Sequence, residues 1–314
     1  MSSVIVVDSA CDLPERIINS RTVEVLPLNL ILNGETLLDS FSATERLKML
    51  HDGTVNLKQD VNTSPATRDQ IVEFLTTKIL PKYDFAIVQT VARSRSPQFD
   101  MWQEVNSSFA AHYREYRNSD RNFTLRIMDS GTVFTGQGLM ALNTIYLGQK
   151  GVSRRELLER SKTLARNIQS YSAPVDLHYL RERARRKGDR TIGLFSATLG
   201  KALNIAPVLY GGQNTTAAVG KVKGHKNAVD KIVGHAMQAI KKGLETPLIS
   251  VGYAGPLEDL KQYGSLDELK VLAKQRNVKV ITSLATLTSV INMGPGTFSL
   301  AVAPTDPKFR LVIE

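Results

Sequence analysis

The stretch that decides the fold is Val4-Ile5-Val6-Val7-Asp8-Ser9-Ala10-Cys11-Asp12-Leu13-Pro14-Glu15. A β-branched run ends in polar, turn-forming residues, and Pro14 suits the first turn of a helix. Residues 85–89 and 125–128 are similar short apolar runs, and the second also ends in Asp-Ser, at Asp129-Ser130. Strand and helix signals alternate through this half of the chain, which predicts a parallel sheet covered by helices on both faces.

Local turn and capping signals support this interpretation. Ser42 with Glu45, and Thr67 with Gln70, form capping-box patterns that open two helices. Residues 23–32 are expected to be extended, and the Asn-Gly pair at 33–34 predicts a hairpin turn.

The second half has a different pattern. We expect helices from Ser153 to about residue 171, from Asp176 to Gly188, and over 228–242 and 266–276, the last opened by a capping box of Ser265 and Glu268. The segments expected to be extended are 205–210, 216–222, 248–253, 279–284, 289–293 and 298–303. Several lie too close in sequence for a helical crossover, so antiparallel pairing is predicted.

These patterns predict an α/β protein of two domains. Residues 1–150 would form an N-terminal parallel-sheet α/β/α domain that carries the ligand loops, and residues 151–314 a second α/β domain with a mostly antiparallel sheet. The boundary is expected near residues 148–151, and 314 residues suit two domains.

Composition narrows the function. Cys11 is the only cysteine, so an internal disulfide and a Cys-based zinc site are excluded. The chain has no signal-peptide leader and no apolar run of about 18 residues, so we expect a cytoplasmic protein without stable membrane insertion. The net charge of +10 leaves a nucleic-acid-binding regulator as an alternative, but aromatic residues are only 6% of the chain and no nucleic acid partner is expected.

One dense basic cluster lies within residues 181–190 and includes Arg183, Arg186 and Arg190. It fits the solvated C-terminal turn of a helix, where cations complement the helix dipole. It also fits a docking patch for an acidic partner, and both interpretations remain open.

Polar residues follow three strands of the predicted parallel sheet: Asp8-Ser9, residues 90–96, and Asp129-Ser130-Gly131-Thr132. The segment Asn62-Thr63-Ser64-Pro65 can join them. Ligands bind beyond the carboxyl ends of such strands, and hydroxyls with helix N-terminal N–H groups would suit one carboxylate or phosphate. Helix capping alone also explains serine and threonine at these positions.

Signals for catalysis are weak. Gly136-Gln137-Gly138 begins a dinucleotide-like pattern, but seven residues separate it from the preceding strand, so a nucleotide site is rejected. The histidines have no metal-ligand spacing, and the chain has no nucleophile elbow. An enzyme that uses Asp8 and Asp129 on a small phosphorylated or carboxylated substrate remains an alternative.

The ordered series of motifs resembles the DegV family, fatty-acid-binding proteins that include the acyl-carrying subunits of bacterial fatty acid kinase. The resemblance covers nearly the whole chain. Its motifs include Asp8-Ser9-Ala10-Cys11-Asp12-Leu13-Pro14, Thr63-Ser64, Asp176-Leu177-x-Tyr179-Leu180, residues 199–209 and Gly294-Pro295-Gly296.

The resemblance implies a non-catalytic protein without a cofactor, which holds a long-chain fatty acid in a tunnel between its domains and presents the carboxylate to a fatty acid kinase. Thr63 matches the threonine that binds the carboxylate in the family. Arg93 replaces the family's serine, and Asn292 its histidine. Both can still bind an anion, or the head group is larger or more charged than a simple carboxylate. The candidate ligand-binding residues are Thr63, Ser64, Arg93, Ser94, Ser96, Asn292 and Gly294.

Magnitudes favour the tail as the source of affinity. Burial of about 14 methylenes at about 0.8 kcal/mol each offers roughly 11 kcal/mol before the costs of association. A hydroxyl hydrogen bond adds only about 1 kcal/mol. The polar group would therefore orient the ligand rather than hold it.

Overall fold

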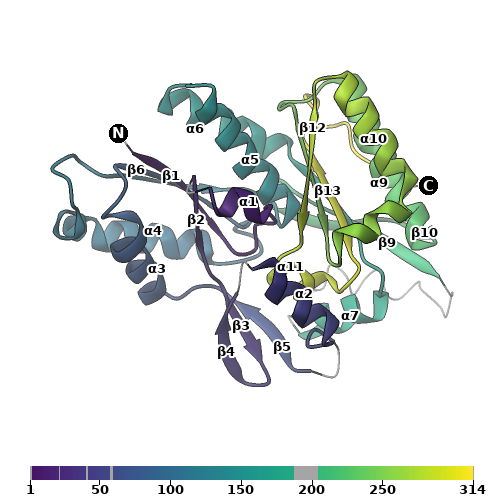
Figure 1. The fold of residues 1–314 in the computed structure, drawn as a ribbon, viewed down its shortest axis with the longest axis horizontal. Helices are drawn as coiled ribbons and strands as arrows, with labels where there is room; N and C mark the ends of the chain where they lie inside the picture. Colours follow the sequence, from purple (N-terminus) through teal and green to yellow (C-terminus); the bar gives the residue numbers. More distant parts are fainter. Residues whose placement is uncertain (1, 21, 40–41, 57–58, 187–203, 314) are drawn as a thin grey trace.

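The structure is a computed structural model that describes residues 2–20, 22–39, 42–56, 59–186 and 204–313 (Figure 1). Two large sheets lie on opposite sides of the molecule, and a small three-stranded sheet lies beneath them (Figure 1). The strands of the parallel sheet all precede residue 150, and those of the second large sheet all follow it.

The first sheet is parallel throughout, in the order β2-β1-β6-β7. Its strands are β1 (Ser3–Asp8), β2 (Val23–Leu26), β6 (Phe85–Thr90) and β7 (Thr124–Asp129). Alternate residues of β1 enter two different cores, Val4 and Val6 on one face, Ile5 and Val7 on the other. Both faces are therefore buried, which confirms the predicted α/β/α domain.

The helices of this half are α1 (Glu15–Ile18), α2 (Ala43–His51), α3 (Arg68–Phe74), α4 (Gln98–Phe109) and α5 (Thr135–Gln149). A π-helical turn spans Leu75–Ile79, and a 3-10 helix spans Ala110–Tyr116. The capping box of Thr67 and Gln70 is present in full at the start of α3. Ser42 also accepts the N–H of Glu45 as expected.

The second large sheet has the order β10-β9-β8-β13-β11-β12, and among its described strand pairs only β11 and β12 are parallel. Its strands are β8 (Gln169–Ala173), β9 (Ile205–Gly212), β10 (Thr215–Lys223), β11 (Leu248–Tyr253), β12 (Lys279–Leu284) and β13 (Phe298–Val302). The helices of this half are α6 (Arg154–Asn167), α7 (Leu177–Arg186), α9 (His225–Lys242), α10 (Gly264–Gln275) and α11 (Leu287–Met293), with a 3-10 turn at Leu257–Gln262. The predicted mostly antiparallel sheet is confirmed.

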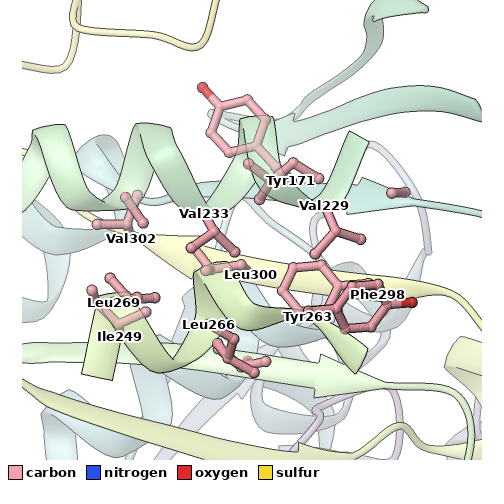
Figure 2. Packing of buried hydrophobic residues seen from close by; sticks show 14 of the residues in the cluster. Tyr171, Val229, Val233, Ile249, Tyr263, Leu266, Leu269, Phe298, Leu300 and Val302 are labelled. Carbon is pink, nitrogen blue, oxygen red and sulfur yellow. The ribbon is translucent and has the colours of Figure 1, made fainter. Parts of the chain in front are cut away.

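Helices α9 and α10 cover one face of this sheet. Figure 2 shows Val229 and Val233 of α9 packed with Leu266 and Leu269 of α10 against Phe298 and its neighbours on the strands. Within the described ranges, no helix is long and apolar enough to cross a membrane.

The small sheet has the order β4-β3-β5, with strands β3 (Asn29–Leu32), β4 (Glu35–Leu38) and β5 (Val61–Ser64). The hairpin turn at Asn33-Gly34 is confirmed, with positive φ at both residues. Strand β5 pairs Thr63 with Leu30 of β3. This pairing places one of the candidate ligand residues on a strand rather than in a loop.

Three local predictions were wrong. Residues 289–293 belong to α11, because the side chain of Thr286 accepts the N–H of Ser289 and starts a helix. The helix that begins at Arg154 ends at Asn167, and strand β8 follows it. Helix α10 starts at Gly264 without a side-chain cap, and the hydroxyl of Ser265 donates to Asp230 instead.

Helix α5 lies between the two large sheets and contacts both. A Cβ on Gly138 would lie 2.3 Å from the backbone oxygen of Asp12, and one on Gly136 would lie 2.1 Å from Oγ1 of Thr132. The glycines of the dinucleotide-like pattern therefore allow close packing of the helix.

Candidate ligand-binding cavity

A cavity of about 700 Å³ lies at the carboxyl edge of the parallel sheet, between that sheet and the second one. Its wall comes from the segments that follow β1, β6 and β7, from β5, α7 and α11, and from β8, β9 and β10. Both halves of the chain contribute. The volume lies in the range of about 300–1,000 Å³ that is usual for small-molecule sites.

The loop after β6 is held by buried Asp8. Its carboxylate accepts the N–H of Val91 at 2.8 Å and that of Ala10 at 3.1 Å. Burial raises the pKa of Asp8 to about 6, although these hydrogen bonds act in the opposite direction. Asp8 does not line the cavity. It fixes Ala10 and Val91, which do.

Asp129 has a similar role at the end of β7. Its carboxylate accepts N–H groups of Arg93 at 3.1 Å and Gly131 at 2.8 Å, and the side-chain amide of Asn214 at 2.6 Å. Asp129 lies outside the cavity wall. The carboxylates of the alternative enzyme hypothesis thus hold loops in place and do not face the cavity.

Thr63 and Asn292 meet at the cavity wall. Nδ2 of Asn292 donates to the hydroxyl of Thr63 at 3.4 Å and to the backbone oxygen of Thr288 at 2.7 Å. Thr288 and Ser64 line the same region. An amide and hydroxyls can together hold a carboxylate or phosphate oxygen.

Helix α11, which carries Asn292, is fixed by two buried carboxylates from the first half. Asp12 accepts the N–H of Thr286 at 2.8 Å and the hydroxyl of Ser289 at 3.4 Å. Asp39 accepts the N–H of Thr288 at 3.2 Å and its hydroxyl at 2.6 Å. Burial is the largest effect on both, and it raises the pKa of Asp12 to about 7 and that of Asp39 to about 6.

The opposite wall is one face of the second sheet. Ser170 and Ser172 of β8 line the cavity, while Tyr171 between them enters the core beneath. Leu209 and Gly211 of β9 also line it. Small and apolar side chains from this sheet, with Val133 and Phe134 after β7, leave room for a hydrocarbon.

Helix α7 turns one face toward the cavity, through Leu180, Arg183 and Ala184. Arg183 is only 4% exposed. Its Nε donates to the hydroxyl of Tyr179 at 3.1 Å, and its Nη1 donates to the backbone oxygen of Val61. The Tyr179 hydroxyl in turn donates to the backbone oxygen of Ile291 at 2.8 Å. These bonds place a guanidinium between β5 and α11.

The structure brings most of the candidate ligand residues together. Thr63, Ser64, Ser94, Ser96 and Asn292 all line the cavity.

Two other candidates do not line it. The Arg93 guanidinium pairs with Asp100 at 2.7 Å, and its side chain is 59% exposed. Gly294 has a φ of +93°, and a Cβ there would lie 3.0 Å from the Tyr179 ring. Its role is therefore a tight turn against Tyr179 rather than a ligand contact.

Of the three arginines that were predicted to dock a partner, the structure describes two, and these differ in their surroundings. For Arg183 the docking prediction was wrong, because its side chain is buried at the cavity. Arg186 is exposed, donates to the backbone oxygen of Gln59 at 3.4 Å, and lies 3.7 Å from the Asp60 carboxylate. Arg190 lies outside the described residues.

Sequence reasoning missed Arg183, Arg95 and the serines of β8 as cavity residues. The i, i+3, i+4 spacing of Leu180, Arg183 and Ala184 was the available signal, because it places all three on one face of a helix. Among the residues that the structure describes, no group of three or more His, Cys, Asp or Glu side chains could hold a metal ion.

Comparisons with known proteins agree on one relationship. A family model described as "Uncharacterised protein, DegV family" matches residues 2–305. A DegV domain-containing protein of Xanthomonas campestris pv. campestris is 32% identical over 308 residues, which cover 97% of this chain and 98% of that protein.

Solved structures show the same fold. A fatty-acid-binding DegV family protein from Thermus thermophilus superposes with a TM-score of 0.73 at 21% identity, covering 97% of this chain and 100% of that one. A stearic-acid-binding protein from Eubacterium ventriosum superposes with a TM-score of 0.72 at 19% identity, covering 96% and 97%.

Proposed function

Because the chain belongs to the DegV family, we propose that it binds a long-chain fatty acid in the cavity between its two sheets. The carboxylate lies beside Thr63 and Asn292, and the tail extends between the parallel sheet and β8–β10. The observation that carries the proposal is the cavity itself, about 700 Å³ in volume, with hydroxyl and amide donors at one wall and both apolar and small polar side chains on the others.

The division of the wall suits an amphiphile. Leu28, Phe134, Leu180, Leu209 and Met293 provide apolar contact area. Each buried methylene stabilises the complex by about 0.8 kcal/mol, so the tail supplies most of the affinity. The hydroxyls and the amide orient the carboxylate.

The protein does not transform its ligand in this proposal. Ser94, Arg95 and Pro97 line the cavity and are exposed, so the loop after β6 brings the cavity wall to the surface. A carboxylate near this loop is accessible to a partner. We propose that the partner is an ATP-using fatty acid kinase, which phosphorylates the presented carboxylate.

Native mass spectrometry of the protein purified from bacteria tests the binding proposal. We expect a mass increment of one long-chain acyl group, and we expect delipidated protein to take up added palmitate or oleate at one equivalent. Protein that carries no acyl chain and takes up neither acid would contradict the proposal.

A further inference from the structure

Arg183 is a buried arginine that no carboxylate pairs with among the residues that the structure describes. It is 4% exposed, and its described contacts are the Tyr179 hydroxyl, the Tyr179 ring at 5.3 Å and the backbone oxygen of Val61. Each of these groups is uncharged. Its remaining terminal nitrogen, Nη2, is buried without a hydrogen-bond partner among the described residues.

A guanidinium keeps its positive charge in proteins. A buried charge without a counter-ion is strongly unfavourable, and an unsatisfied donor adds to the cost. Burial lowers the pKa of Arg46, the other buried arginine described at this junction, and the nearby carboxylates of Asp12 and Asp39 oppose that effect. Arg183 has no such neighbour within ion-pair distance in the part of the chain that the structure describes.

The position of Arg183 indicates what would balance it. Its side chain lines the cavity together with Thr63 and Asn292. Val61, which accepts its Nη1, lies two residues before Thr63 on β5, a rise of about 7 Å. Tyr179, which fixes its Nε, is bonded to the residue before Asn292. The guanidinium is thus held at the donors proposed for the head group.

We infer that Arg183 is the counter-charge for an anionic head group, so that the cavity selects ionised amphiphiles, carboxylates or phosphates, over neutral ones with the same tail. This inference rests on the proposed function and defines its ligand class. Hydroxyl and amide groups can donate to an alcohol or a protonated acid as well as to an anion, and they favour the anion only moderately. A fixed positive charge separates ionised from neutral ligands more strongly.

The test compares three ligands by titration calorimetry on delipidated protein: oleate, oleyl phosphate and oleyl alcohol. We expect both anions to bind at least about tenfold more tightly than the alcohol, which is typical of a charge-assisted hydrogen bond. The tighter of the two anions identifies the preferred head group. Equal affinity for the alcohol and both anions would overturn the inference and leave the proposed function intact. No binding of any of the three would contradict the proposed function itself.

Substitution of Arg183 provides a second, independent test. Arg183→Met keeps an unbranched apolar side chain in place of the aliphatic part of the arginine and removes the charged guanidinium, and it is expected to weaken oleate about tenfold or more while changing oleyl alcohol less than about threefold. Arg185→Gln is the matched control, because Arg185 lies on the same helix with a side chain that is 75% exposed and paired with Glu182. Folded Arg183→Met protein that retains the preference for anions would also overturn the inference. If this variant does not fold, the comparison of ligands on the unchanged protein decides.

Discussion

The side-chain amide of Asn292 donates to the hydroxyl of Thr63 at 3.4 Å, across 229 residues of sequence. The bond joins α11, which follows a strand of the second sheet, to β5 of the small sheet. A hydroxyl that accepts such a bond can also donate to a ligand oxygen. Thr63 therefore lies where both halves of the chain contribute to the proposed head-group site.

We expect Thr63→Val to weaken oleate binding by about fivefold, since it removes one hydroxyl hydrogen bond worth about 1 kcal/mol and preserves the shape of the side chain. Calorimetric titration of delipidated protein measures the change. Thr77→Val on the exposed helical surface is the control and should leave binding unchanged. A loss of more than about a hundredfold in folded Thr63→Val protein would contradict a tail-dominated affinity.

Filling the cavity should have a much larger effect. Ala218 of β10 lines the cavity, opposite Leu209 of β9 in the sheet register. We expect Ala218→Phe to weaken oleate binding more than about a hundredfold, because a phenyl ring displaces several methylenes at about 0.8 kcal/mol each. Ala111→Phe, on an exposed helical segment, controls for added hydrophobicity. Unchanged binding in the filled variant would place the tail elsewhere.

The sequence predicted a strand correctly where both of its faces are buried against apolar side chains. Strand β1 is buried on both faces, so its sequence is a continuous β-branched run, which is typical of a strand in a parallel sheet. Strand β8 was missed because its alternate residues, Ser170 and Ser172, are polar and face the cavity. Helix α11 was mistaken for a strand because the five residues 289–293 are too few to show a period that would distinguish a helix from a strand.

The site was predictable to a similar extent. The polar segments that follow parallel strands meet at one edge of the sheet for topological reasons, so Ser94 and Ser96 could be expected at one cavity. The fate of an arginine depends on its neighbours in space. Arg93 forms an ion pair with Asp100 in the first turn of α4, and Arg183 donates to the backbone oxygen of Val61 on β5. The sequence alone did not reveal either contact.

Close packing of α5 gives a stability prediction. We expect Gly138→Ala to lower the free energy of unfolding by about 1–3 kcal/mol, because its Cβ would collide with the backbone oxygen of Asp12. Gly234→Ala is the control, since a Cβ there meets nothing within 4 Å and alanine stabilises a helix by about 0.5–1 kcal/mol. Urea unfolding followed by circular dichroism measures both. Equal stability of the two variants would show that α5 can move away from Asp12.

Asp12 should make stability depend on pH. Its pKa is raised to about 7 by burial, above the ordinary value of 3.8. Between these values the folded state keeps a proton that the unfolded chain has lost, so this group lowers stability as pH rises from about 4 to about 7. His235 acts in the opposite direction, because burial lowers its pKa from 6.5 to about 4. The effect of Asp12 is therefore measured as the difference between the unchanged protein and a variant altered only at Asp12. Both proteins contain His235, so its contribution cancels in that difference.

The substitution Asp12→Asn should remove the cost of ionising the buried acid, because an asparagine side chain resembles the protonated carboxyl group in shape and charge. Relative to the unchanged protein, the variant is expected to gain about 3 kcal/mol of unfolding free energy between pH 5 and pH 8, because the linkage that is lost spans about two pH units at about 1.4 kcal/mol each. Urea unfolding at both pH values measures this gain. Asp120→Asn, at a fully exposed carboxylate, should show none. A difference between variant and unchanged protein that stays constant with pH would mean that Asp12 is ionised throughout, and that a charged carboxylate holds the start of α11.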